Sequence, residues 1–229
     1  MTDRKSASSM SSAEQTRFKN GINTLLANPS NPYGKLVAAH VDMSHNQHGM
    51  NAIGTQRFLP WHRVYLLRIE ELLKAIDPAA FVPYWDWTTT RSVPTWIRTL
   101  KPTVFVPGIG SVIVKRNASI PAKKNVSAIM ALTTFTSFSD TLENGPHGEV
   151  HMEVGVVNGV NQTMAKITVS PADPLFWLHH AQVDRLWSQW QSANPGKNPA
   201  LSGANATFDP WSEKESNVRS ISALGYRYV

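Results

Sequence analysis

The stretch Asp173-Pro-Leu-Phe-Trp-Leu-His-His-Ala-Gln-Val-Asp-Arg-Leu-Trp187 carries apolar residues at intervals of three and four. This spacing predicts a helix over residues 172–190 with one packed face. Ser170-Pro171, immediately before it, is typical of a helix start. Because His179 and His180 lie inside this segment, the sequence predicts a packed helix that carries histidine side chains.

A second segment, Pro60–Ile76, has the strongest periodicity in the chain and carries His62 on its apolar side. Its proline suits the first turn of a helix. Two more helices are predicted over Ser12–Leu26 and Tyr33–Met43, and His40 lies near the end of the latter. The chain is therefore expected to be mainly α-helical.

The remaining segments predict loops and short strands. Val104–Val114 is typical of a hairpin, Pro146–Val150 of a short helix opened by proline, and Val154–Val169 of turns with short strands. Fifteen prolines and thirteen glycines indicate long loops around the helices. At 229 residues, the chain is expected to form a single domain over residues 1–229, with a polar, disordered leader over residues 1–11.

The charge pattern gives little support for a nucleic-acid partner. The net charge is +6, but the lysines and arginines are scattered and only Lys115-Arg116 and Lys123-Lys124 are paired. Neither a secretory signal nor a transmembrane run is found. We therefore expect a cytoplasmic protein with no membrane partner, although an exported and processed form would have the same sequence.

The histidines indicate a metal site. The chain has no cysteine, so a metal must be bound by histidine or oxygen ligands. The eight histidines form two clusters: His40, His45, His48 and His62, then His147, His151, His179 and His180. Single histidines are usually hydrogen-bonded core groups, but His147 and His151 are four residues apart and on a helix would share one face. An all-histidine set favours a catalytic or redox ion over a structural zinc, and a zinc hydrolase stays open as an alternative.

Two long stretches resemble the copper-binding signatures of the tyrosinase family. They are Arg57-Phe-Leu-Pro-Trp-His-Arg-Val-Tyr-Leu-Leu-Arg-Ile-Glu70 and the stretch Asp173–Trp187 quoted above. Shorter pieces resemble the family in the same order: Pro83–Trp87, Leu142–His151 and the terminal Gly225-Tyr-Arg-Tyr228. The resemblance runs from about Tyr33 to the C-terminus.

The resemblance implies a four-helix bundle core that holds two copper ions, each through three histidines, with dioxygen as co-substrate. It assigns His40 and His62 to the first ion and His147, His151 and His180 to the second. Many members place the middle ligand of the first ion at the position of Ile53 here, so the ligand must come from elsewhere; His48 is our choice and His45 the rival.

Helical geometry adds two expectations for the predicted helix over residues 172–190. His179 should point some 100 degrees away from His180 and should not easily share its copper. Asp184, four residues after His180, should accept a hydrogen bond from a ligand imidazole. The alternative for Asp184 is an ion pair with Arg185 or another basic residue.

The implied function is a tyrosinase or catechol oxidase that converts small phenols to ortho-quinones. Glu143 matches the glutamate that holds a water in family members, and it is the candidate catalytic residue. Gly148 stands where some phenol-hydroxylating members have Asn, which argues against efficient monophenol hydroxylation. The chain also lacks the cysteine of the thioether bridge found in plant and fungal members, as in bacterial members.

The rival function is a reversible dioxygen carrier like the related hemocyanin units. Carriers usually have a further domain that shields the metals, and we expect no lid domain after Val229, so catalysis is favoured. A copper-delivery protein is a further partner compatible with this interpretation.

Overall fold

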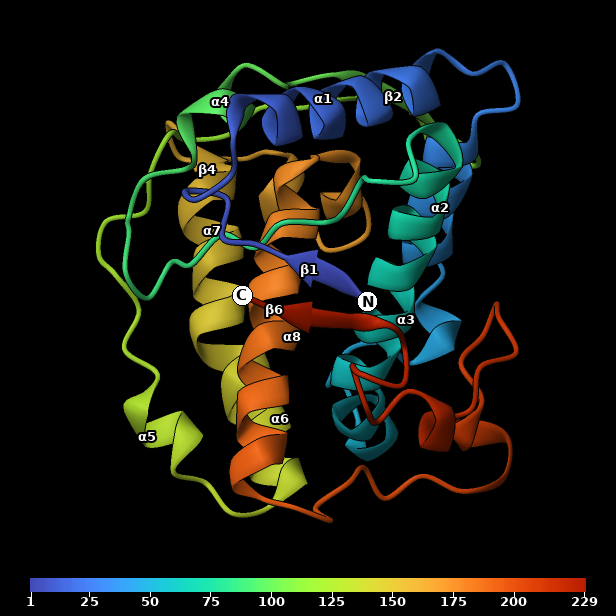
Figure 1. Ribbon diagram of the computed structural model, residues 1–229, viewed down its shortest axis with the longest axis vertical. Coiled ribbons are helices and arrows are strands. Elements are labelled where there is room, and N and C mark those ends of the chain that lie inside the picture. The colour runs from blue at the N-terminus through green and yellow to red at the C-terminus, as the bar shows by residue number, and fades with distance from the viewer.

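Four helices surround the centre of the computed structural model, which describes all 229 residues. They are α2 (Pro32–Val41), α3 (Ala52–Ile76), α7 (Gly148–Gly155) and α8 (Leu175–Ala193). Figure 1 shows α2 and α3 on one side of the molecule and α7 and α8 on the other, with α1 (Ser12–Ala27) across one end. Helix α6 (Phe135–Leu142) packs against α3. The predicted mainly α-helical, four-helix core is confirmed.

Helix α3 begins eight residues before the predicted start at Pro60. The Asn51 side chain caps it by accepting a hydrogen bond from Gly54 N at 2.8 Å, and such a cap stabilises the first turn. Pro60 therefore lies inside the helix, where it removes only one backbone hydrogen bond. The prediction of Pro60 as a first-turn residue was wrong because burial on both sides of the proline keeps the helix continuous.

The segment that leads into α7 also differs from the prediction. A π-helical turn, Glu143–His147, contains Pro146 and is kinked at Gly145, which has φ −92° and ψ −115°. The helical structure therefore begins before the proline and continues directly into α7. Helix α8 follows a short 3-10 turn, Ser170–Ala172, that holds the predicted Ser-Pro start.

Residues 1–11 do not form the expected disordered leader. Strand β1 (Thr2–Arg4) pairs in parallel with β6 (Tyr226–Tyr228), as the two central arrows of Figure 1 show. The fully buried Arg4 donates from Nε to Glu70 Oε2 at 2.8 Å. Polar composition predicted exposure to solvent, but here an internal carboxylate balances the buried charge.

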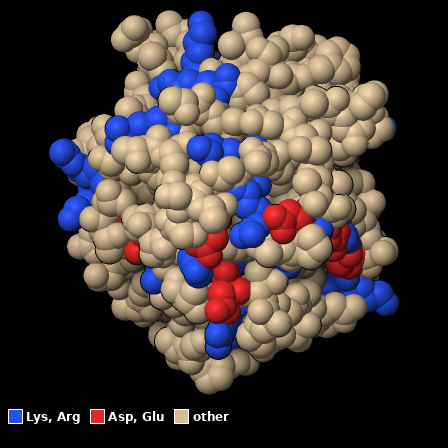
Figure 2. All heavy atoms as spheres, turned by 45° about the horizontal axis from the view of Figure 1, so that its top comes forward, with Lys and Arg blue, Asp and Glu red and all other residues tan.

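Two small hairpins complete the fold. Strands β2 (Thr103–Val106) and β3 (Gly110–Ile113) form the predicted one, and β4 (Val156–Val157) pairs with β5 (Val160–Asn161). The shorter helical pieces are η1 (Met43–His45), α4 (Thr95–Arg98), α5 (Ser127–Met130), η3 (Thr163–Ala165), η5 (Gly203–Ala206) and η6 (Glu215–Asn217). None of the helices combines the length and the apolar character needed to cross a membrane. Figure 2 shows basic side chains dispersed over the face it presents, several of them beside acidic ones.

Candidate metal centre

Seven of the eight histidines form two groups inside the four-helix core. The first group is His40, His48 and His62, and the second is His147, His151, His179 and His180. Within each group, the ring nitrogens that could bind an ion lie within 4.8 Å of one another. The first group comes from α2, α3 and the loop between them, and the second from α8, α7 and the turn before α7.

The first group has the spacing of ligands around one ion. His40 Nε2 lies 3.1 Å from His48 Nε2 and 3.4 Å from His62 Nε2. Two nitrogens about 2.0–2.1 Å from a common ion, at a tetrahedral angle, are roughly 3.3 Å apart. His62 Nδ1 donates to the Phe58 carbonyl at 2.8 Å, so Nε2 of the neutral ring is the unprotonated nitrogen that faces the other two rings.

His48, and not His45, completes this group. The His45 ring stacks on Trp61, with 6.3 Å between ring centroids, and its Nε2 lies 3.8 Å from Asp42 Oδ2. His45 is therefore occupied outside the first group. The loop brings His48 back between the two helices, where its ring is buried.

The second group is built on helical spacing. His151 Nε2 lies 3.2 Å from His180 Nε2. His147 Nδ1 donates to the Glu143 carbonyl at 3.0 Å, and His151 Nδ1 donates to the Met164 carbonyl at 2.8 Å. His147 Nε2 is buried without a hydrogen-bond partner. These bonds fix the neutral tautomers that leave Nε2 free for an ion.

His179 lies closer to the second group than helical geometry predicted. Its ring stacks on His147, with 5.2 Å between centroids and 11° between planes, so His179 belongs to the second group by position. His147, in the turn before α7, contacts the rings of both His179 and His180. However, Trp87 Nε1 donates to His179 Nδ1 at 3.0 Å. The neutral His179 ring then carries its proton on Nε2, which leaves no free lone pair for a metal.

Burial lowers the pKa of several of these imidazoles and favours their neutral form. Together with the charges of neighbouring histidines, it holds the pKa of His40, His62 and His147 well below the ordinary value. Burial also lowers the pKa of His151 to about 4, and burial with the neighbouring histidines holds the pKa of His180 well below its ordinary value. Unprotonated nitrogens that face one another in a buried site need a cation between them. The residues therefore fit two ions that prefer imidazole ligands, of which copper is one.

The sequence matches the family described as the common central domain of tyrosinase, over residues 30–111 and 109–193. The chain belongs to the tyrosinase family of type 3 copper proteins. Members are dicopper proteins, and each histidine group of this chain is able to bind one copper.

Relatives of two kinds are similar to this tyrosinase-family chain. A tyrosinase of Streptomyces antibioticus is 27% identical, and the match covers 93% of this chain and 94% of the relative. Hemocyanin units G and H of Sepia officinalis are also 27% identical, over 90% of this chain and 40% of the relative. A functional unit of octopus hemocyanin has the same fold, with a TM-score of 0.79, 22% identity, and coverage of 100% of this chain and 68% of that one. A tyrosinase of Burkholderia thailandensis gives a TM-score of 0.70 at 16% identity, covering 100% and 73%.

Two phenylalanines pack against the histidine groups. Phe58 on α3 contacts both His62 and His147, with centroid distances of 4.9 and 4.8 Å. Phe176 stacks on His180 at 3.9 Å. The His62 and His180 rings stack directly on each other at 4.5 Å, so the two groups are adjacent. Sequence reasoning missed these aromatic contacts because an apolar residue on a helix is ordinarily interpreted as general core packing.

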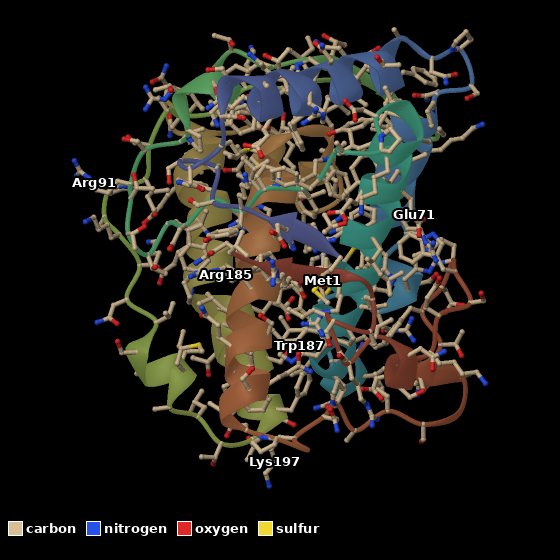
Figure 3. All side chains as sticks on the ribbon, in the orientation of Figure 1. Met1, Glu71, Arg91, Arg185, Trp187 and Lys197 are labelled. Carbon is tan, nitrogen blue, oxygen red and sulfur yellow. The ribbon has the colours of Figure 1, made fainter.

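Asp184 does not contact an imidazole, contrary to the sequence-based expectation. Its Oδ1 accepts from Arg63 Nε at 2.6 Å, and its Oδ2 accepts from the hydroxyls of Tyr226 and Tyr228 at 2.7 and 2.6 Å. The Arg63 guanidinium also lies 3.6 Å from the ring centroid of Trp187, which is labelled on α8 in Figure 3. The alternative of an ion pair was correct, with Arg63 as the basic residue. Asp184 therefore joins α3 to α8 and holds the C-terminal strand.

The Glu143 carboxylate contacts the loop of the first group. Oε1 lies 3.2 Å from His48 Nδ1, and both oxygens accept from Gly49 N, at 2.9 and 3.0 Å. The cavity beside it, of about 260 Å³, is lined by histidines of both groups together with Gly148 and Met152. A small molecule in this cavity would therefore contact both groups.

Proposed function

We propose that this chain is a phenol oxidase that converts catechols to ortho-quinones with dioxygen. The observation that carries the proposal is the cavity of about 260 Å³, which is open to solvent and ends at His48 of the first group and at His147 and His151 of the second. Sites for drug-sized ligands usually have about 300–1,000 Å³. A cavity slightly smaller than this range favours a single-ring phenol.

The proposed ligands are His40, His48 and His62 for the first copper and His147, His151 and His180 for the second. When bound, the copper pair supplies the electron transfer between the phenol and dioxygen. Two catechols give four electrons and four protons in total, which reduce one dioxygen to two waters and leave two quinones.

The side chains around the cavity orient the substrate. Met152, Met164 and Ile167 give it an apolar wall against which an aromatic ring packs. The hydrogen bonds from His147 and His151 to backbone carbonyls keep these two imidazoles in fixed orientations. The orientations would stay the same when the oxidation state of a bound metal changes. The protein therefore contributes mainly position and shape.

Monophenol hydroxylation is proposed to be the weaker activity. It requires a base or a held water to deprotonate the phenol. Both oxygens of Glu143 already accept hydrogen bonds from the loop of the first group, and Gly148 has no side chain to help hold a water. We expect catechol oxidation to proceed much faster than hydroxylation of the matching monophenol.

Reversible dioxygen carriage is the second candidate, because hemocyanins are among the relatives and structural neighbours. A carrier works best when its metals are shielded from phenols. The open cavity at the histidines favours catalysis instead.

The deciding experiment loads the purified protein with copper and follows oxygen uptake and quinone formation with catechol and phenol. We expect rapid quinone formation from catechol, at a rate that depends on copper and is absent in the zinc-loaded protein. Dioxygen binding that reverses on degassing, with no quinone, would reject the oxidase in favour of the carrier. A protein that takes up zinc but no copper would reject both.

A further inference from the structure

Glu143 forms hydrogen bonds to both histidine groups. Its carboxylate accepts from His48 Nδ1 of the first group at 3.2 Å, and its backbone carbonyl accepts from His147 Nδ1 of the second group at 3.0 Å. The π-helical turn makes this possible, since its kink at Gly145 leaves the Glu143 carbonyl within reach of the His147 ring. The carboxylate therefore contacts the loop of the first group directly, at the edge of the cavity.

The loop of the first group is held at both ends, by Gln47 and by a hydrogen bond from Asn51 to Asn46. His40 and His62 lie on helices, whereas His48 lies in the connection between η1 and α3. Gln47 Nε2 donates to the His40 carbonyl at 3.1 Å and holds the start of the loop. Glu143 is the only side-chain hydrogen-bond partner of His48 Nδ1.

The contact between the Glu143 carboxylate and the loop is close. Gly49 N donates to both carboxylate oxygens, and a Cβ at Gly49 would lie 2.7 Å from Glu143 Oε2. A side chain at position 49 would therefore displace the carboxylate from the loop backbone. Glu143 is also 7% exposed, so little water competes for its oxygens. Gly49 in the loop and Glu143, which is distant along the chain, therefore form one close contact.

We propose that Glu143 is a positioning residue that fixes His48 as a ligand of the first copper, a role different from holding a water for the substrate. The carboxylate accepts the Nδ1 proton of His48, sets its tautomer, and turns the Nε2 lone pair toward His40, 3.1 Å away. The chain has no cysteine that could form a thioether bridge to a histidine, so this hydrogen bond is what restrains the loop histidine, His48. The inference rests on the dicopper centre of the proposed function, and it concerns copper binding, not turnover.

The test measures copper content and affinity by competition between the metal-free protein and a chromophoric copper(I) chelator. Removing a carboxylate that orients a metal-bound histidine typically costs about 10–100-fold in affinity. We expect Glu143→Ala to weaken one of the two coppers by this factor and to leave the other unchanged, because the carbonyl that holds His147 remains. Glu143→Gln keeps one acceptor oxygen and should weaken the same copper less.

Two further variants make the result specific. Gly49→Ala leaves the carboxylate in the chain but displaces it from the loop, and it should weaken the same copper. Glu149→Gln is the matched control, since Glu149 lies in the same region, is exposed and pairs with Lys124 at 2.8 Å. It should bind both coppers as the unchanged protein does.

Equal weakening of both coppers in Glu143→Ala would indicate general damage and overturn the inference, as would wild-type affinity for both. Thermal unfolding of each metal-free variant checks that it folds. A protein that binds two coppers and loses one selectively in Glu143→Ala, yet forms no quinone, would support the inference while the proposed oxidase fails.

Discussion

The two histidine groups of the proposed dicopper centre have different supports. In the second group, His147 and His151 are one helical turn apart, His180 comes from α8, and backbone carbonyls hold two of the rings. In the first group, two histidines lie on helices and the third, His48, lies on a loop held by the side chain of Glu143. The second group is thus fixed mainly by helices and backbone carbonyls, whereas one ligand of the first group, His48, depends on a side-chain contact from a distant part of the chain.

The difference has a physical consequence for metal binding. A ligand on a helix is oriented before the ion arrives, whereas a loop ligand loses conformational freedom when it binds, and that loss opposes binding. We therefore expect the first site to be the weaker and more exchangeable of the two. Both sites share the α3–α8 contact, so damage to that contact should affect both sites equally.

The largest expected effect comes from removing a helical ligand. His151→Ala deletes a ligand whose orientation is fixed by the Met164 carbonyl, and no other histidine is free to replace it. We expect this variant to lose the second copper and to lose catechol oxidation by more than about 100-fold, beyond the range for residues that only orient ligands. Copper analysis and oxygen uptake measure the two effects.

Two variants, His48→Ala and His45→Ala, test which loop histidine is the ligand of the first copper. The first variant should lose the first copper, and the second should keep both, because His45 stacks on Trp61 and contacts Asp42 outside the group. Loss of copper in His45→Ala, with retention in His48→Ala, would contradict the assignment.

The next variant, Asp184→Asn, should affect both histidine groups. Asp184→Asn removes the charge that faces the buried Arg63 between α3 and α8. Burial raises the pKa of Asp184, but Arg63, Arg4 and the two tyrosine hydroxyls outweigh it, so the pKa is lowered and the group is ionised at neutral pH. Breaking such a buried pair costs about 3–5 kcal/mol.

Urea denaturation of the metal-free protein measures the loss caused by Asp184→Asn. The exposed pair of Arg68 and Glu71 supplies the control, since Glu71→Gln should change the free energy of unfolding by no more than about 1 kcal/mol. A cost for Asp184→Asn as small as that of the control would mean that the α3–α8 contact does not depend on this ion pair.

The same contrast explains what could be predicted from the sequence. The helices and the His147–His151 pair follow from periodicity, which is a local property. The role of Asp184 was misjudged because its partners, Arg63 and Tyr226, are distant along the chain, and helical spacing pointed only to the nearby imidazole. The contact of Glu143 with His48 spans 95 residues and leaves no spacing signal.

Residues 1–11 show the same limit. Their polar composition predicted disorder, yet Arg4 is buried because Glu70 and the C-terminal tyrosines meet it from other parts of the chain. Local pattern thus predicts which segments are helical. Ion pairs between residues that are distant along the chain decide which polar side chains are buried. These pairs cannot be derived from local sequence pattern.

The smallest expected effect concerns His179, the histidine that shares the second group with no free lone pair. Trp87→Phe removes the donor to His179 Nδ1, which is 3.0 Å from Trp87 Nε1, and leaves an aromatic ring in place. We expect both coppers to remain bound and the free energy of unfolding to fall by about 1–3 kcal/mol, the cost of one unsatisfied buried group. His179→Gln should likewise keep both coppers, whereas His180→Gln should lose the second. Equal copper loss in His179→Gln and His180→Gln would show that the hydrogen bond from Trp87 does not prevent His179 from binding copper. The second group would then have four ligands, whereas the first has three.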